Sequence, residues 1–261
     1  AFCIYLDRHR KDLTKEQFSK SLLERKTDVL GISVITNEYA NSGLIAAQLA
    51  KQINPEIRTV VGGVSAISNP LGYIQDKNVD YVVFAEGEYI FRDLCDFLNG
   101  KGKFPEKGIA YKEDGKIITT PKPELITDLD SLPLPAYNLV DFKKYTNQVQ
   151  RESVDRPRAM PFARMRTSRG CPFDCCFCEV GSIAGKNPRY RSLENVASEM
   201  EWLKKDYGIK ALIFDDDNIV VNKKRAKSLF RMMIDRNYDL KWNVPGLAVY
   251  MLDDEMLDLM K

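Results

Sequence analysis

Four of the six cysteines in this 261-residue chain lie within eight consecutive positions, and this cluster constrains the chain more than any other feature. Cys171, Cys175 and Cys178 form a C-x3-C-x2-C pattern, with Cys176 beside the second of them. A disulfide uses two thiols, whereas this spacing holds three thiols within one short loop. Three thiolates in one loop suit a metal centre with three protein ligands and one exchangeable position. The sequence therefore predicts a metal centre here.

A zinc knuckle is the main alternative, and it needs a fourth Cys or His ligand at a suitable spacing. The only histidine, His9, lies far upstream, and neither Cys nor His follows Cys178. Cys176 is adjacent to Cys175, and neighbouring side chains in a tight loop tend to point apart. We therefore favour three cysteine ligands over zinc or a disulfide, and we interpret Cys176 as a bystander.

The same loop resembles the cluster loop of radical S-adenosylmethionine (SAM) enzymes, whose pattern is C-x3-C-x-aromatic-C. The resemblance implies that Cys171, Cys175 and Cys178 ligate three irons of a four-iron four-sulfur cluster, and that SAM chelates the fourth iron. It also implies that Phe177 packs beside the adenine of SAM. A strand predicted at Met165 to Ser168 enters the loop at its carboxyl end, where barrel enzymes keep their chemistry.

The composition indicates a soluble globular protein, with 44% hydrophobic residues, 29% charged residues and a net charge of +2. This balance gives no electrostatic footprint for nucleic acid. The most apolar long window, Val29 to Ala50, contains Glu38 and several polar residues, so it is a poor membrane span. Free cysteines without a signal peptide indicate a reducing cytoplasm. Because the chain opens at Ala1 inside an apparent strand, we expect a fragment of a longer protein whose first strand lies upstream.

Residues 1 to about 100 alternate strand and helix signals, which is typical of a parallel sheet with helices on its faces. Thr14 and Gln17 are placed to form a capping box at the start of a helix. Cys95 lies on an apolar stripe with Leu94, and Cys3 lies in the opening strand, so both are predicted core thiols. Further strands are predicted at 28–33, 58–61 and 80–84, and further helices at 43–53 and 88–98.

Three loops follow strands of this predicted sheet, at the carboxyl edge where doubly wound sheets bind ligands. They carry hydroxyls, glycines or a helix start at Ser33 and Thr36, Gly62 and Gly63, and Gly87 and Glu88. In this order the loops resemble the cobalamin-binding domain that precedes many radical SAM barrels. The resemblance implies that these six residues contact cobalamin, and that the glycine pair lines its nucleotide tail.

The sequence departs from that family at two places. Ala85 replaces the first glycine of the third loop, and no complete D-x-H-x-x-G motif with a cobalt-ligating histidine is present. Asp7-Arg8-His9 matches only the first half of that motif, so His9 is interpreted as a surface residue. A radical SAM enzyme with an empty first domain is therefore an alternative.

The segment after Gly108 has a different character. Asp114-Gly115 between two apolar runs predicts a hairpin, and four prolines follow it. The stretch Leu129 to Pro135 resembles the connector between the two domains of the same family. The predicted divisions are 1–107 for the Rossmann-like domain, 108–160 for the hairpin and proline-rich connector, and 161–261 for the first part of the barrel.

A run of polar residues, Asp215 to Asn218, follows a predicted strand at Ala211 to Phe214. Short polar side chains at the end of a barrel strand favour a functional site. By the resemblance this run stands where other members contact the SAM amino group, so Asp216 and Asp217 are predicted SAM contacts. A capped turn is the alternative for each of them. Helices are predicted from Ser192 to about Gly208 and at 223–235. The resemblance implies a third barrel strand at 243–247.

Taken together, these features predict an α/β protein with a Rossmann-like parallel sheet of the cobalamin-binding type, followed by a partial (β/α) radical SAM barrel. The resemblance implies reductive cleavage of SAM to a 5'-deoxyadenosyl radical, with an electron from an external flavodoxin- or ferredoxin-type donor. It further implies cobalamin-dependent C-methylation, or related radical chemistry, on an unactivated carbon of a small molecule. A methylthiotransferase is disfavoured, because it would carry three more clustered cysteines. A non-catalytic cobalamin- or metal-binding module is the alternative from another class.

Overall fold

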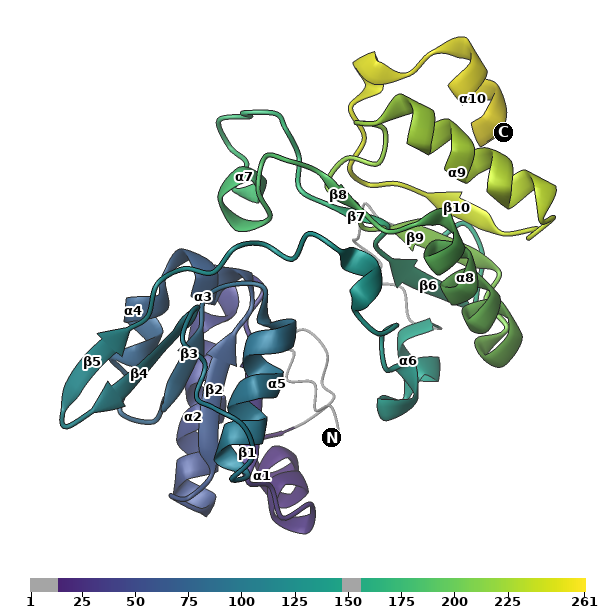
Figure 1. The fold of residues 1–261 in the computed structure, drawn as a ribbon. Coiled ribbons are helices and arrows are strands. Elements are labelled where there is room, and N and C mark those ends of the chain that lie inside the picture. The colour runs from purple at the N-terminus through teal and green to yellow at the C-terminus, as the bar shows by residue number, and fades with distance from the viewer. Residues whose placement is uncertain (1–13, 147–155) are drawn as a thin grey trace. The chain divides into compact units, whose positions relative to one another are not determined.

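The computed structural model describes residues 14–146 and 156–261, and the chain divides into two compact units between Ile126 and Thr127 (Figure 1). Each unit has its own sheet and its own apolar core. The predictions for Cys3, His9 and the opening strand fall outside the described residues. Within the described part of the chain, none of the helices has the length and apolar character needed to cross a bilayer.

The first unit is a five-stranded sheet in the order β1-β2-β3-β4-β5. Strands β1 to β3 are parallel, and β4 and β5 form an antiparallel hairpin beside β3. The elements are α1 (Lys15–Glu24), β1 (Val29–Ser33), α2 (Ala40–Ile53), β2 (Arg58–Gly62), α3 (Val64–Ser68), α4 (Pro70–Ile74), β3 (Tyr81–Val83), α5 (Gly87–Leu98), β4 (Ile109–Glu113) and β5 (Lys116–Thr119). The sequence groups the hairpin with the connector 108–160, but β4 pairs with β3 and so extends the sheet.

Alternate residues of the parallel strands enter two different apolar clusters, as expected for strands buried on both faces. Val61 and Val82 pack in one cluster with residues of α2, α3 and α4. Val60 and Val83 pack in the other with Leu94 of α5. Helices therefore cover both faces of the sheet, as the alternation of strand and helix signals predicts.

Local signals correctly mark the start of α1 but not every feature of this unit. The Thr14 Oγ1 accepts from the Gln17 main-chain nitrogen, and the Gln17 side chain accepts from the Thr14 nitrogen, which confirms the capping box. The prediction that Cys95 is a core thiol is wrong in degree: Leu94 is fully buried, but Cys95 is half-buried at the edge of the stripe. Helices α3 and α4 were not predicted, because five residues are too few to show a helical period.

The second unit contains three parallel strands, with β9 between β6 and β10, alternating with helices. This is the beginning of a (β/α) barrel, and a short antiparallel ribbon of β7 and β8 is inserted after β6. The elements are α6 (Phe142–Thr146), β6 (Phe162–Met165), β7 (Ser168–Arg169), α7 (Val180–Ile183), β8 (Arg189–Tyr190), α8 (Leu193–Tyr207), β9 (Ala211–Phe214), α9 (Lys223–Asp235), β10 (Lys241–Asn243) and α10 (Asp254–Met260), with 3-10 turns at Leu129–Ser131, Tyr137–Leu139 and Val249–Met251.

Helices α8 and α9 cover one face of this sheet with a large apolar core. Trp242 of β10 stacks on Phe230 of α9, with the ring centroids 5.0 Å apart. Ser192 caps α8, and Gly208 ends it in the left-handed conformation, as predicted. The predicted strands at 165–168 and 243–247 are displaced, because β6 ends before residue 166 and β10 ends at Asn243. Pro245, which lacks an N–H donor, follows soon after β10.

Two glycines allow main-chain segments to approach each other closely at strand ends. Gly63 follows β2 with a φ of 91°, and a Cβ there would lie 2.6 Å from the Val34 carbonyl oxygen. Gly170 follows β7 with a φ of 92°, and a Cβ there would lie 2.8 Å from the Gly185 carbonyl oxygen. Both positions combine a left-handed backbone with a clash against main chain, so neither tolerates a side chain.

We expect the substitution Gly63→Ala to lower the free energy of unfolding by about 3 kcal/mol, because it adds backbone strain and overpacking. The neighbouring Gly62→Ala is the matched control: its Cβ would meet nothing closer than 3.7 Å, so stability should stay within about 1 kcal/mol of wild type. Urea denaturation followed by circular dichroism measures both. Equal losses for the two variants would contradict the packing role of Gly63.

Gly170→Ala and Gly208→Ala separate backbone strain from a steric clash at the second site. Both residues have a positive φ, but a Cβ at Gly208 would meet nothing within 4 Å. Gly208→Ala should therefore lose only the left-handed strain of about 1–2 kcal/mol, whereas Gly170→Ala should lose roughly twice as much. Thermal unfolding of the two variants gives the comparison, and a Gly170→Ala variant as stable as Gly208→Ala would show that the contact with Gly185 is unimportant.

Candidate functional site

The cysteine loop follows β7 at the carboxyl end of the barrel sheet. Cys171 is half-buried, Cys175 and Cys178 are exposed, and all three are free thiols. The main chain of the loop is anchored: the Cys171 nitrogen donates to the Gly185 carbonyl at 3.2 Å, and the Cys178 nitrogen donates to the Cys175 carbonyl at 3.0 Å. The sequence pattern thus corresponds to one folded loop that carries accessible thiols.

These thiols share a loop without forming a finished metal site. Among the described residues, no three Cys, His, Asp or Glu side chains are gathered in an arrangement that could hold a metal ion. The donor set nevertheless fits an iron-sulfur cluster with three cysteine ligands, because the thiols are unpaired and accessible. Phe177 is 87% exposed, so its ring has little packing against the described residues. An exposed aromatic ring beside the thiols fits the predicted contact with an adenine.

Three consecutive aspartates after β9 each hold a different part of the segment that leads into this loop. The Asp215 carboxylate pairs with Arg164, whose Nε donates to Oδ2 at 2.7 Å. The Asp215 carbonyl accepts from Arg166 Nε at 2.8 Å. The Asp217 carboxylate accepts from the Gly170 main-chain nitrogen at 2.8 Å. The polar run that the sequence singles out therefore lies against the cysteine loop.

Asp216, the middle residue of the run, is only 3% exposed. Its two oxygens accept from the Thr167 nitrogen at 3.2 and 3.1 Å, from the Thr167 hydroxyl at 2.8 Å, and from the Ser168 hydroxyl. Burial raises the pKa of Asp216, and these hydrogen bonds oppose the shift. A carboxylate offers about four acceptor sites. The contacts observed for Asp216 are concentrated on Oδ1, while Oδ2 accepts only from the shared Thr167 N–H. Its contact with SAM stays a prediction.

Arg225 of α9 reaches the same turn, and sequence reasoning did not identify it. Its guanidinium donates to the Thr167 hydroxyl at 3.2 Å, to the Thr167 carbonyl at 3.0 Å and to the Arg191 carbonyl at 3.0 Å. It also lies over the ring of Tyr190, 4.9 Å from the centroid. Burial lowers the pKa of Arg225, and the Asp216 charge opposes that shift. No local motif marks an arginine in the first turn of a helix as part of a site.

Glu199 is a second buried charge that the sequence reasoning missed. It is 1% exposed, pairs with Arg191 at 2.5 Å and accepts a hydrogen bond from the Tyr137 hydroxyl. Burial and the Glu199 charge raise the pKa of Tyr137. Arg191 in turn donates to the Arg166 carbonyl at 2.9 Å. A charged residue on the apolar stripe of α8, three residues after Val196, is the signal that could have identified Glu199.

In the first unit, the structure brings together part of the predicted cobalamin site. Ser33 and Gly62 are register partners at the carboxyl ends of β1 and β2. Ser33 is exposed, as is Thr36 in the following loop. Gly63 packs tightly on the main chain of Val34, whereas a Cβ at Gly62 would be accommodated. Protein packing therefore explains Gly63 and leaves the absence of a side chain at Gly62 unexplained.

The third loop of this edge begins α5 and completes the set. Gly87 is the first residue of α5, and a Cβ there would lie 3.5 Å from the Val83 side chain. Glu88 is exposed. Two apolar side chains that sequence reasoning did not include are also exposed in the first two loops, Ile35 at 65% and Val64 at 37%. Exposed apolar residues beside a glycine pair provide a surface on which a large flat ligand could pack.

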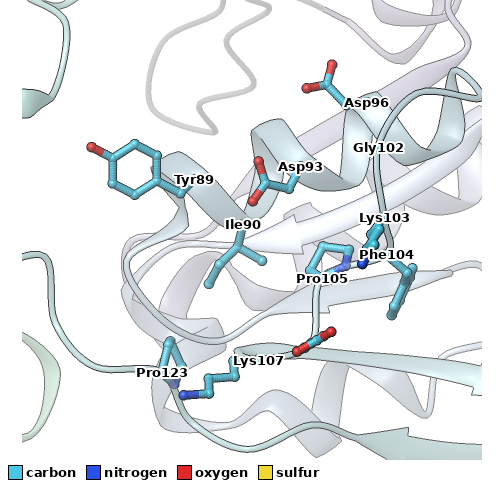
Figure 2. A pocket seen from close by; sticks show the side chains of 11 residues that line it. Tyr89, Ile90, Asp93, Asp96, Gly102, Lys103, Phe104, Pro105, Lys107 and Pro123 are labelled. Carbon is cyan, nitrogen blue, oxygen red and sulfur yellow. The ribbon is translucent and has the colours of Figure 1, made fainter.

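A separate groove of about 410 Å³ lies between α5 and the segment 102–107 (Figure 2). Its lining mixes both charge signs, with Asp93 and Asp96 on α5 and Lys103 and Lys107 on the facing segment. None of the predicted cobalamin residues lines it. The groove is therefore distinct from the residues predicted at the strand ends.

Two protein families match the chain, one in each half. The B12 binding domain matches residues 3–95, and the radical SAM superfamily matches residues 165–261. The second match includes the cysteine loop, the aspartate run and Arg225.

Curated relatives match across both halves of the chain. An uncharacterized methyltransferase of Pyrococcus horikoshii is 34% identical over 239 residues, covering 91% of this chain and 50% of the relative. Cytidylyl-2-hydroxyethylphosphonate methyltransferase of Streptomyces wedmorensis is 31% identical, covering 96% of this chain and 51% of the relative. Anaerobic magnesium-protoporphyrin IX monomethyl ester cyclase of Rubrivivax gelatinosus is 28% identical, covering 97% of this chain and 45% of the relative. The chain spans about half the length of these relatives.

Solved structures agree in fold. The radical SAM methyltransferase TsrM from Kitasatospora setae matches with a TM-score of 0.67 at 20% identity, covering 94% of this chain and 48% of that protein. The cobalamin-dependent SAM radical enzyme OxsB matches with a TM-score of 0.70 at 20% identity, covering 94% of this chain and 35% of that protein. The order of the two domains, the cysteine loop and these matches together show that the chain belongs to the cobalamin-binding radical SAM enzyme family.

Proposed function

We propose that the protein is a radical SAM enzyme in which Cys171, Cys175 and Cys178 hold a four-iron four-sulfur cluster and SAM completes the coordination. The observation that carries this proposal is the loop itself: three free thiols on a main chain anchored at the carboxyl end of the barrel strands. When bound, the cluster would supply the electron that cleaves SAM reductively into methionine and a 5'-deoxyadenosyl radical. In this proposal the electron comes from an external flavodoxin- or ferredoxin-type donor. The exposure of Cys175 and Cys178 leaves the loop accessible to such a partner.

The protein's own residues orient SAM in this proposal. Phe177 presents an exposed ring for the adenine. Asp217 accepts from the Gly170 nitrogen and so fixes the main chain one residue before Cys171.

Free, exposed thiols persist in a reducing compartment, which supports a cytoplasmic location.

We propose that the first unit binds cobalamin at the carboxyl edge of β1 to β3. The contacts are Ser33, Thr36, Gly62, Gly63, Gly87 and Glu88, with exposed Ile35 and Val64 adding apolar surface. Gly62 supports this assignment most directly, since its neighbours leave room for a side chain that the sequence does not supply.

The reaction proposed is methylation of an unactivated carbon in a small organic substrate. Several curated relatives are methyltransferases, one of them named a hopanoid C-2 methylase and another a cobalamin-dependent radical SAM methyltransferase. The cyclase among them makes ring closure the second candidate. The named substrates of these relatives differ widely, so the proposal extends to the reaction class and not to a particular molecule.

Single alanine substitutions of the loop cysteines test the cluster. Each of Cys171→Ala, Cys175→Ala and Cys178→Ala should abolish the four-iron complement after anaerobic reconstitution, because three thiolates are the whole protein ligand set. Cys176→Ala is the matched control and should retain it. Iron and sulfide analysis with an absorbance spectrum gives the result. A full iron content in a variant that lacks all three cysteines, or zinc in place of iron in the wild type, would overturn the proposal.

A graded series at Gly62 tests cobalamin binding. Gly62→Ala and Gly62→Val should weaken hydroxocobalamin binding progressively, with the valine variant weaker by about tenfold or more, because a larger side chain occupies the ligand's approach. Absorbance titration measures affinity, and urea denaturation confirms that the fold is kept. Unchanged affinity in Gly62→Val would place cobalamin elsewhere, and a wild type that binds iron but no cobalamin would favour the empty-domain alternative.

A further inference from the structure

We propose that Asp216 and Arg225 are positioning residues, which lock the turn at Thr167 and Ser168 and thereby set the cysteine loop for SAM without touching SAM. This inference rests on the proposed radical SAM function and gives a role to Arg225, which no sequence motif singles out. It also gives Asp216 a role different from direct cofactor contact. All of the residues involved belong to the second unit.

Thr167 is fully buried and is held from two sides. Its hydroxyl donates to Asp216 Oδ1 at 2.8 Å and accepts from Arg225 at 3.2 Å. Its main-chain nitrogen donates to Asp216, and its carbonyl accepts from Arg225 at 3.0 Å. Every polar atom of Thr167 is therefore bonded to one of the two charged side chains. Because Asp216 follows β9 and Arg225 lies in the first turn of α9, the turn after β6 is fixed by two elements of the next barrel unit.

The restraint continues from Thr167 towards the first cysteine. The Ser168 hydroxyl donates to Asp216, and Ser168 pairs with Tyr190 in the β7–β8 ribbon. Arg225 lies over the Tyr190 ring, so the same guanidinium contacts β8 and Thr167, the residue before β7. Cys171 follows only three residues after Ser168. A change in the turn would therefore be transmitted to Cys171 through a very short piece of chain.

The charges of this arrangement depend on each other. Asp216 is nearly excluded from solvent, and the two side chains meet through the Thr167 hydroxyl, which bonds to both. Removing one member of a buried charge pair leaves the other uncompensated. A buried charge pair is often no more stabilising than apolar residues of similar volume. A positioning function gives a reason for burying charges here, since hydrogen bonds fix direction and apolar contacts do not.

Direct contact with SAM is the competing assignment for Asp216. Three donors already bond to the Asp216 carboxylate: the Thr167 main-chain N–H, shared between both oxygens, and the Thr167 and Ser168 hydroxyls, both on Oδ1. Oδ2 keeps acceptor capacity, but the side chain is only 3% exposed, so a positively charged amino group would have to reach it through the packing around the turn. The two assignments differ in what a substitution does to the protein before any cofactor is added.

The test uses full-length protein with four substitutions: Arg225→Met, Arg225→Lys, Asp216→Asn and the control Arg231→Met. Arg231 also lies on α9 but pairs with Glu255, away from the loop. The first readout is amide hydrogen exchange at residues 167–171 in cluster-free protein. The second is SAM affinity, from titration of the electron paramagnetic resonance signal of the reduced cluster.

Arg225→Met and Asp216→Asn should speed exchange at residues 167–171 and weaken SAM binding, each by about tenfold or more relative to Arg231→Met. Arg225→Lys should give an intermediate effect, because one ammonium cannot reproduce the fork of the guanidinium. Normal exchange and normal SAM affinity in the folded variants would overturn the proposal. Asp216→Asn that loses SAM binding without faster exchange would also overturn it, in favour of direct contact.

The exchange arm keeps this inference separate from the proposed function. If wild-type protein takes up no cluster, the radical SAM proposal fails, yet faster exchange in Arg225→Met still shows that the turn is held as inferred. If wild type binds cluster and SAM while all variants exchange like Arg231→Met, the positioning role fails alone. Arg225→Lys and Asp216→Asn keep the test available if Arg225→Met does not fold.

Discussion

The hydrogen bonds between Thr167 and Asp216 are the interaction on which the barrel half of this structure depends. They join the end of β6 to the end of β9, across 49 residues of sequence. The chain between these two residues contains the cysteine loop, the β7–β8 ribbon and α8. Both ends of this long segment are held at the same hydrogen bonds. The loop can be exposed and still have a defined direction, because its two ends are fixed inside the protein.

Much of the fold follows from local signals. The alternation of strand and helix patterns predicts the doubly covered sheet, and Thr14 with Gln17 predicts the start of α1. The errors have local causes as well. Helices of five residues are too short to show a period, and Gly246, inside the strand predicted at 243–247, lies close to the carbonyls of Asp216 and Asp217 instead of continuing β10. Tertiary contacts of this kind leave no trace in a window of a few residues.

The candidate sites show the same division. The cysteine ligands are readable because their spacing is local, whereas the partners of the aspartate run come from distant positions. Arg225 contacts Thr167 across 58 residues, and no pattern around either residue indicates the other. Gly62 and Gly63 look equivalent in sequence. Only the structure separates the glycine required by the Val34 main chain from the glycine whose neighbours would admit a side chain.

The consecutive attachment of Asp215, Asp216 and Asp217 to successive parts of residues 164–170 has a consequence for how this barrel half can be recombined with another. The three aspartates contact successive positions of this segment in order, so an insertion or deletion within either strand end breaks the pairing of every contact beyond it. In this chain the two segments therefore form one structural unit. A chimera that borrows the cysteine loop of another family member will need the end of β9 from the same donor.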